Sequence, residues 1–330
     1  MNAETSRRLL FDMLRIRSVE ETIAARYGEQ KMRCPTHLSV GQEAVAAAAG
    51  AVLEKTDLAV SGHRAHAHYL AKGGSLKAMI AEIYGKVTGC ARGKGGSMHL
   101  IDESVGFMGS TAIVGGTVPV GVGLSYPMKL NKTGQIACVF LGDAVPETGV
   151  FFESVNFAVV KQLPVLFLCE NNGYSVYSPL SVRQPPGRKL YELVAGFGLT
   201  THHGDGNDAR AVHAALSEGV AAIRRGEGPR FYEFETYRWR EHCGPNYDND
   251  IGYRSVAEYE AWKLRDPVPA LQRALIADGV ISEADVAAMQ AMIDAEIDEA
   301  FAFAEASPFP EPGEAFADVY AAGAIASAAG

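Results

Sequence analysis

The sequence has few cysteines and no paired cysteine motif. Its five cysteines are an odd number, spread from Cys34 to Cys243, and no two of them form a C-x-x-C pair. This pattern argues against both a disulfide framework and a zinc ribbon. The thiols are therefore expected to be reduced.

Long hydrophobic runs are also absent. The longest apolar stretches, such as 44–52 and 136–141, fall well short of the ~20 residues that a membrane-spanning helix needs. The N-terminal segment carries Arg7 and Arg8 without the apolar stretch of a secretory signal behind them. We expect no membrane association and a cytoplasmic location.

An excess of positive charge is missing as well. The 330 residues contain 30 Lys and Arg against 39 Asp and Glu, a net charge of −9, and the basic residues are scattered. A surface that binds nucleic acid would need clustered Lys and Arg, so a nucleic-acid partner is not expected. With 48% hydrophobic and 21% charged residues, the chain has enough apolar side chains for a large core.

Apolar spacing predicts alternating helices and strands. An amphipathic helix is expected from about Thr5 to Gly28, and a second over 41–54. Two strand–helix–strand units follow, with strands predicted at 135–141, 164–169, 198–203 and 230–237, and helices at 147–162 and 208–225. This order is typical of an α/β fold with a Rossmann-like parallel sheet and helices on both faces.

The predicted organisation is one domain with additions at both ends. Residues 1–305 are expected to form a single α/β domain, with its core over about 35–255 and C-terminal helices over 255–305. Ser282 and Asp285 have the spacing of a capping box at the start of one of these helices. Several prolines after Ser307 predict an extended tail over 306–330.

Polar residues follow two of the predicted strands. Gly142-Asp143-Ala144 comes directly after the strand at 135–141, and Asn171-Asn172 follows the strand at 164–169. Open parallel sheets bind ligands outside the carboxyl ends of their strands. If these strands are neighbours, the Asp143 carboxylate and the Asn172 amide oxygen offer ligands to Mg²⁺, which in proteins is usually also bound by phosphate oxygens.

The same two segments carry a family resemblance. Gly142-Asp143-Ala144, followed after the 26 residues Val145–Glu170 by Asn171-Asn172, resembles the GDG…NN motif of thiamine-diphosphate enzymes. Gly204-Asp205-Gly206 matches GDG better, but no asparagine pair lies about thirty residues beyond it. The first site alone is therefore coherent with the motif.

A series of further motifs extends the resemblance along the chain. The segments, in order, are His37-Leu38 with Gly41-Gln42-Glu43-Ala44, His63-Arg64-Ala65-His66, Gly93-Lys94-Gly95-Gly96-Ser97-Met98-His99, Ile113-Val114-Gly115, Glu170-Asn171-Asn172-Gly173-Tyr174 and Thr236-Tyr237-Arg238. Together they are similar to the alpha subunit of the decarboxylating component of 2-oxo acid dehydrogenase complexes, the pyruvate, branched-chain and acetoin group. The fold implied is the diphosphate-binding module of the thiamine-diphosphate-binding fold.

The resemblance implies a role for each matching residue. Asp143, the side chain of Asn172 and the backbone carbonyl of Tyr174 would hold Mg²⁺, and Arg64 would contact the diphosphate of thiamine diphosphate. The other residues that it places at the cofactor are His63, Ile113, Val114, Gly142, Ala144, Arg238 and His242. The candidate catalytic residues are His242, His99 and His37, with His242 first.

The activity implied is oxidative decarboxylation of a 2-oxo acid, or cleavage of acetoin or a diketone, with acyl transfer to a lipoyl acyltransferase. Such enzymes need a glutamate on a pyrimidine-binding module that this chain has no room for, so a beta subunit and an α2β2 heterotetramer are expected. Two alternatives stay open: acyl transfer to an aldehyde or sugar, as in carboligases and transketolase-like enzymes, and a non-catalytic scaffold that retains the fold.

Some residues depart from the family pattern or allow another interpretation. Ala144 and Ala112 replace glycines, His63 stands in place of a tyrosine and Glu241 in place of a small residue, so the sequence does not identify the substrate. His63, His66 and His68 also form a group of three imidazoles within six residues, which leaves a zinc site as a less favoured alternative.

Overall fold

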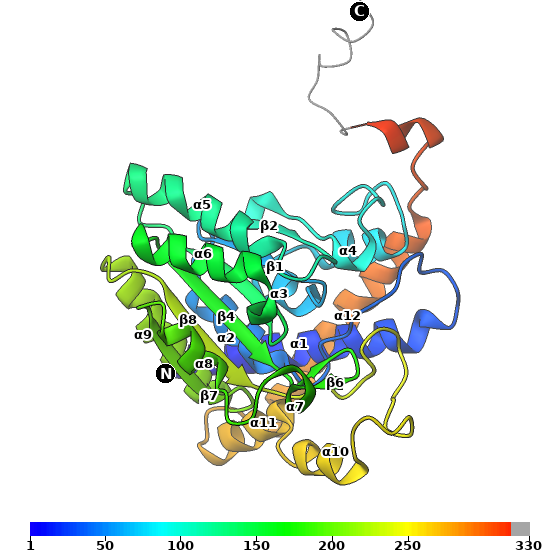
Figure 1. Ribbon diagram of the computed structural model, residues 1–330. Helices are drawn as coiled ribbons and strands as arrows, with labels where there is room; N and C mark the ends of the chain where they lie inside the picture. Colours follow the sequence, from blue (N-terminus) through cyan, green and yellow to red (C-terminus); the bar gives the residue numbers. More distant parts are fainter. Residues whose placement is uncertain (318–330) are drawn as a thin grey trace, which may run out of the picture.

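The computed structural model describes residues 1–317, and a six-stranded sheet lies at its centre (Figure 1). All neighbouring strands are parallel, in the order β2-β1-β3-β4-β8-β7. The strands are β1 (Leu58–Ser61), β2 (Phe107–Ser110), β3 (Ala137–Gly142), β4 (Val165–Asn171), β7 (Thr200–Asp205) and β8 (Arg230–Glu235). The predicted α/β class is confirmed, and the two strands that precede Asp143 and Asn172, β3 and β4, are neighbours.

Helices cover both faces of this sheet (Figure 1). One face packs against α5 (Thr117–Asn131), α6 (Gly149–Val160) and α8 (Leu190–Ala195). The helices that share the larger core on the other face are α1 (Ala3–Tyr27), α2 (Glu43–Val52), α3 (His66–Ala71), α4 (Leu76–Ile83), α9 (Ala209–Arg224), α11 (Pro267–Ala277) and α12 (Glu283–Ala306). None of the helices within residues 1–317 combines the length and apolarity needed to cross a bilayer.

Side-chain alternation in the central strands explains the two cores. In β4, Leu166 and Leu168 enter the larger core, whereas Val165, Phe167 and Cys169 enter the core beneath α5 and α6. Successive side chains of a strand point to opposite faces of its sheet. A strand that is apolar at every position is therefore buried on both sides, as expected for a parallel sheet.

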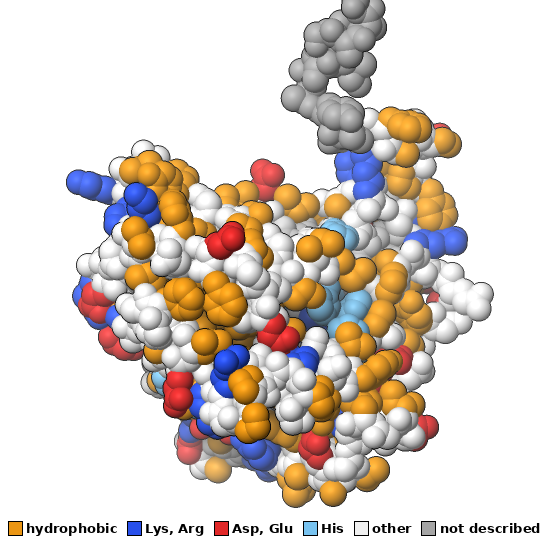
Figure 2. Space-filling model, in the orientation of Figure 1, with side chains coloured by type: hydrophobic (Ala, Val, Ile, Leu, Met, Phe, Trp, Pro, Cys, Tyr) orange, Lys and Arg blue, Asp and Glu red, His pale blue; other side chains and the backbone are white. Residues whose placement is uncertain are grey.

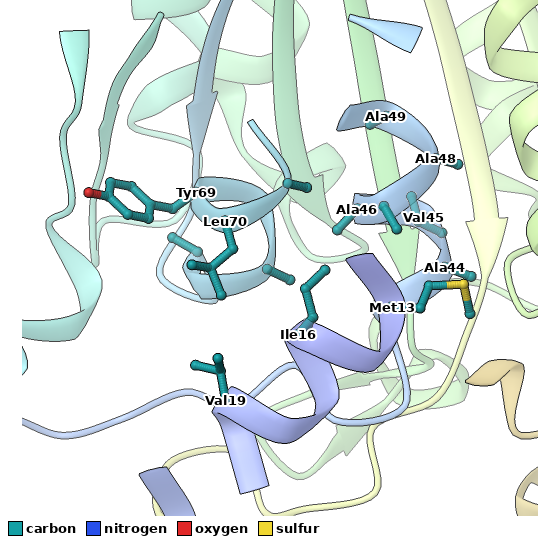
Figure 3. Packing of buried hydrophobic residues seen from close by; sticks show 14 of the residues in the cluster. Met13, Ile16, Val19, Ala44, Val45, Ala46, Ala48, Ala49, Tyr69 and Leu70 are labelled. Carbon is teal, nitrogen blue, oxygen red and sulfur yellow. The ribbon is translucent and has the colours of Figure 1, made fainter. Parts of the chain in front are cut away.

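The N-terminal helix packs across α2 and α3 in the larger core (Figure 3). Asn2 caps α1 by accepting a hydrogen bond from the Thr5 N–H at 2.8 Å, and Met13, Ile16 and Val19 are buried on its inner face. Gly50 of α2 allows close approach to α3, since a Cβ at this position would lie 2.2 Å from the Ala71 carbonyl oxygen. This close packing lets the helices cover the sheet compactly.

The C-terminal part lies beside the N-terminal helix, with α12 in contact with α1 (Figure 1). The predicted capping box is present, with the Ser282 and Asp285 side chains each bound to the other residue's backbone N–H. Two further short elements lie in this part of the chain, α10 (Val256–Lys263) before α11 and a 3₁₀ turn at Pro312–Phe316 after α12. Residues 318–330 of the predicted tail lie outside the described residues.

The sequence missed several short elements. β1 and β2 were not predicted, and neither were α3, α4 or the hairpin of β5 (Tyr174–Ser175) and β6 (Ser178–Pro179). Strands of four residues or fewer carry too little apolar repetition to be distinguished from turns. β1 matters for the site because it ends at Ser61, directly before His63 and Arg64.

Candidate active site

A cleft opens at the carboxyl ends of the central strands. Its walls are the segments that follow β1, β2, β3 and β4, together with Gln42 and a loop that follows β8. The lining includes nine of the residues singled out from the sequence, His63, Arg64, Val114, Gly142, Asp143, Ala144, Asn172, Tyr174 and His242. Figure 2 shows histidine, acidic and basic side chains close together where this face of the molecule is hollowed.

Asp143 places a buried carboxylate at the end of β3. The residue is 3% exposed, and its carboxylate accepts a hydrogen bond from the Arg183 guanidinium, which also contacts Glu147. Burial raises the pKa of Asp143, and the charge of Arg183 acts in the opposite direction. Arg183 lies on α7 (Leu180–Arg183), outside every motif noted in the sequence. Its guanidinium supplies a positive charge beside the buried carboxylate.

Asn172 comes to the same cleft from the end of β4. Its amide nitrogen donates to Gln42 Oε1 at 3.3 Å, and its amide oxygen accepts from the Tyr174 N–H at 3.2 Å. The Tyr174 hydroxyl donates to the Glu258 carboxylate at 2.8 Å. These contacts fix the amide of Asn172 and the side chain of Tyr174 beside the cleft.

Arg64 supplies the positive charge of the cleft. Its guanidinium donates to the Leu38 carbonyl and, at 3.1 Å, to the His242 carbonyl. Burial, and then the charge of Arg238, lower the pKa of Arg64 to about 10. It therefore remains protonated at neutral pH and favours an anionic ligand in the cleft.

Three histidines meet at one side of the cleft. We call His37, His63 and His242 the histidine cluster, since their ring centroids are separated by 4.6, 5.0 and 5.4 Å. Burial, followed by the charge of Arg64, lowers the pKa of His37 to about 2, of His63 to about 4 and of His242 to about 3. All three imidazoles are consequently neutral at pH 7.

The alternative zinc group of His63, His66 and His68 is not assembled. His66 contacts Glu20 at 2.9 Å and Ser97 at 2.7 Å, through different ring nitrogens. His68 contacts Ser61 at 2.8 Å and Glu170 at 3.0 Å in the same way. With both nitrogens occupied, neither ring has a lone pair available for a metal.

Four of the predicted site residues do not line the cleft, and one of them, His37, lies behind the lining residues His63 and His242 and contacts their rings. His99 is exposed, and Ile113 is 68% exposed beside the lining residue Val114. Arg238 is 1% exposed and donates to the Val176 carbonyl at 2.8 Å and to the Tyr253 hydroxyl at 2.9 Å. In this structure Arg238 therefore braces the loop that carries His242.

The comparisons with known proteins cover nearly the whole chain. Residues 11–313 match the dehydrogenase E1 component family. The chain belongs to this family. It is 36% identical over 309 residues to the pyruvate dehydrogenase E1 component subunit alpha of Rickettsia conorii, covering 94% of each chain. It is 36% identical over 317 residues to the chloroplastic subunit alpha-3 of Arabidopsis thaliana, covering 94% of this chain and 73% of the relative.

These findings confirm the resemblance seen in the sequence. The chain is an alpha subunit of a 2-oxo acid dehydrogenase E1 component, an oxidoreductase, and this assignment fits better than a carboligase or a scaffold. The family implies thiamine diphosphate as cofactor and a beta subunit as partner.

The glycine-rich segment over 91–96 binds a carboxylate from the same chain. Backbone N–H groups of Ala91, Gly93, Gly95 and Gly96 all donate to Glu82, at 2.7 to 3.0 Å. The Glu82 side chain is fully buried. Four donors around one carboxylate leave this loop no N–H arrangement for a phosphate, so its glycines serve to order the loop that leads to His99.

Sequence reasoning missed four groups in or beside the cleft. Gln42 and Glu170 lie in motifs whose other residues were singled out, and His68 was considered only as a metal ligand. His68 stacks on Phe140 with ring centroids 4.0 Å apart. Arg183 had no signal, because only the folded chain brings its loop to Asp143.

Proposed function

We propose that this E1 alpha chain binds thiamine diphosphate in the cleft through Mg²⁺. Asp143, the amide oxygen of Asn172 and the backbone carbonyl of Tyr174 would hold the metal, and Arg64 would contact the diphosphate. Two oxygen donors at adjacent strand ends of one cleft are the ligand type that Mg²⁺ takes together with phosphate oxygens. Gly142 and Ala144 flank Asp143 and would form the backbone wall at the diphosphate.

The observation that carries the proposal is the Arg183–Asp143 ion pair. A carboxylate that is 3% exposed strongly favours a positive partner. The Arg183 guanidinium fills that role here, and a bound metal ion would fill the same role. Arg183 would then be released toward the diphosphate, for which a guanidinium is a good donor.

The cofactor, when bound, supplies a carbanion that adds to the substrate carbonyl and an electron sink for decarboxylation. The chain's own residues position the reactants. His242 and His37 are neutral at pH 7, so each offers one ring nitrogen as a hydrogen-bond acceptor and the other as a donor for positioning the reactants. The backbone of Ile113 and Val114 would contact the aminopyrimidine, and His63, Arg238 and His99 complete the proposed set around the cofactor and the reaction centre.

The partner assignments complete the proposal. A beta subunit would supply the pyrimidine-binding half of the site in an α2β2 heterotetramer, and exposed Ile113 and Val114 at the rim of the cleft are apolar groups that such a partner would cover. The acyl group would pass to a lipoyl acyltransferase. The relatives are named pyruvate dehydrogenases, so pyruvate is the first 2-oxo acid to test. A cytoplasmic location belongs to the same proposal.

The deciding experiment measures cofactor affinity in the full chain assembled with its beta subunit. Isothermal titration with thiamine diphosphate should give binding that requires Mg²⁺ and is lost in Asp143→Asn. The matched control is Asp278→Asn, since Asp278 forms a surface ion pair with Arg210 far from the cleft. Binding that is equal in Asp143→Asn and the wild type, or that persists in EDTA, would overturn the metal site.

A second experiment tests the reaction and its acceptor. With the beta partner, pyruvate and lipoyl domains, carbon dioxide release should be accompanied by lipoyl reduction. If carbon dioxide appears while the lipoyl domains stay oxidised, the acceptor assignment is wrong and an aldehyde or sugar acceptor is favoured. Full-rate decarboxylation by the isolated chain would contradict the need for a beta subunit.

A further inference from the structure

The histidine cluster has the composition of a metal site. Within the described residues, one potential ligand nitrogen from each of the three rings lies within 4.8 Å of the other two. His37 Nδ1 is buried and has no hydrogen-bond partner there. The three rings come from separate parts of the chain, the segment before α2, the end of β1 and the loop after β8, and the fold alone brings them together.

Three other histidines of the chain use their ring nitrogens in contacts with neighbouring side chains. His66 and His68 use both ring nitrogens in hydrogen bonds, and His203 contacts Glu235 at 3.0 Å. No contact of this kind involves the ring nitrogens of the histidine cluster within residues 1–317. Buried polar groups are normally hydrogen-bonded, so the buried Nδ1 of His37, which has no partner among the described residues and faces two half-buried imidazoles, is the atom that favours a ligand here.

We propose that the histidine cluster binds a divalent cation of the zinc class, at a site separate from the proposed Mg²⁺ ligands. Three imidazoles plus one water form a common zinc coordination set. Three nitrogens at ~2.0–2.1 Å from a tetrahedral zinc lie about 3.3 Å apart. The ligand nitrogens now lie within 4.8 Å of one another. They would therefore move closer together by about 1.5 Å at most, which side-chain rotation can provide.

The electrostatics of the cluster select the type of cation. Arg64 donates to the His242 carbonyl, so a positive charge lies beside the three rings and opposes any weakly held cation. Mg²⁺ prefers oxygen ligands and gains little from imidazole, whereas Zn²⁺, Cu²⁺ and Co²⁺ bind imidazole strongly. The low pKa values of the cluster keep its lone pairs free of protons at pH 7.

Metal at the cluster would also block the cleft. His63 and His242 are part of its lining, and a bound zinc would occupy ring nitrogens that the proposed function uses to position the reactants. Zinc should therefore inhibit the assembled enzyme. This consequence rests on the proposed function, whereas metal binding by the cluster does not.

The test uses the full chain without cofactor, so that it is independent of catalysis. In a buffer with excess Mg²⁺, isothermal titration with Zn²⁺ should show one site, and Co²⁺ at the same site should show the visible absorption of a four-coordinate ion. His63→Gln should weaken Zn²⁺ binding by more than the ~10–100-fold that loss of an outer-shell partner produces. His203→Gln is the matched control and should bind like the wild type.

Several outcomes would overturn the proposal. These are the absence of a stoichiometric Zn²⁺ site, a site that survives His63→Gln, and equal weakening by His203→Gln. Circular dichroism checks the fold of each variant, and His242→Gln provides a second ligand change should His63→Gln not fold. A cluster that binds zinc while thiamine diphosphate fails to bind would refute the proposed function and leave this inference standing.

Discussion

Replacing Arg183 with glutamine tests the charge balance of the site most directly. The change removes the cation from a pair in which the Asp143 side chain is 4% exposed and the Arg183 side chain 10% exposed. It leaves a carboxylate with little access to water and no positive partner. Arg183 also contacts Glu147, but that side chain is 28% exposed and can be solvated.

The expected loss follows from the burial of Asp143. Removing one partner of a buried ion pair reduces the free energy of unfolding by about 3–5 kcal/mol. Burial already raises the pKa of Asp143, so the carboxyl group can relieve part of the penalty by taking up a proton. We therefore expect a loss at the lower end, about 3 kcal/mol, in the absence of metal.

Mg²⁺ with thiamine diphosphate should reverse most of this loss. The metal would supply the missing positive charge at Asp143, and in the variant it need not displace a guanidinium. The stabilisation produced by the ligands should accordingly be larger in Arg183→Gln than in the wild type. Urea denaturation at pH 7, in EDTA and then with saturating Mg²⁺ and cofactor, measures both quantities.

The control for this variant is Arg210→Gln. Its ion pair with Asp278 lies at the surface, with side chains 40% and 51% exposed, and its removal should change stability by less than about 1 kcal/mol. A loss in Arg183→Gln no larger than in this control would refute the reasoning. So would a large loss that Mg²⁺ and cofactor leave unchanged.

Three further predictions concern packing, loop order and pH. Gly121→Ala should lower the free energy of unfolding by about 1–3 kcal/mol, because its Cβ would lie 2.4 Å from Val139 Cγ2. Gly123→Ala in the same helix is the control: its Cβ would have no atom within 4 Å, and it should raise the free energy of unfolding by about 1 kcal/mol. Urea denaturation measures both changes. Glu82→Gln should weaken the four N–H contacts of the glycine-rich loop and speed its hydrogen exchange; unchanged exchange would contradict this role. Burial and the charge of Arg64 lower the pKa values of the histidine cluster, so these imidazoles take up protons in the unfolded chain before they do so in the folded chain. The free energy of unfolding should therefore fall as the pH decreases below 6.5, by at most about 1.4 kcal/mol per pH unit for each ring and by less for the partly exposed rings. Urea curves in EDTA between pH 8 and 5 measure this slope, which should be shallower in His63→Gln.

Most of the long elements of the fold could be predicted because their signals are local, although the 15-residue helix α5 was missed. α1, α9, β3 and β4 show helical or strand periodicity in the sequence, and the capping box at Ser282 marks the start of α12. Asp143 and Asn172 follow strands that the sequence identifies, so their meeting requires only that β3 and β4 pair. In that pairing, Gly142 of β3 lies beside Glu170 of β4.

The sequence by itself determined the fold class, the family and the residue types at the strand ends, because periodicity and motif spacing are properties of neighbouring positions. Only the tertiary structure decided that Arg183 meets Asp143, that Glu82 fills the glycine-rich loop, and that His63 joins His37 and His242 rather than His66 and His68. These contacts join residues that are from 9 to 205 positions apart in the sequence. Burial of both partners in one core fixes such contacts, and no local pattern records which segments that core will bring together.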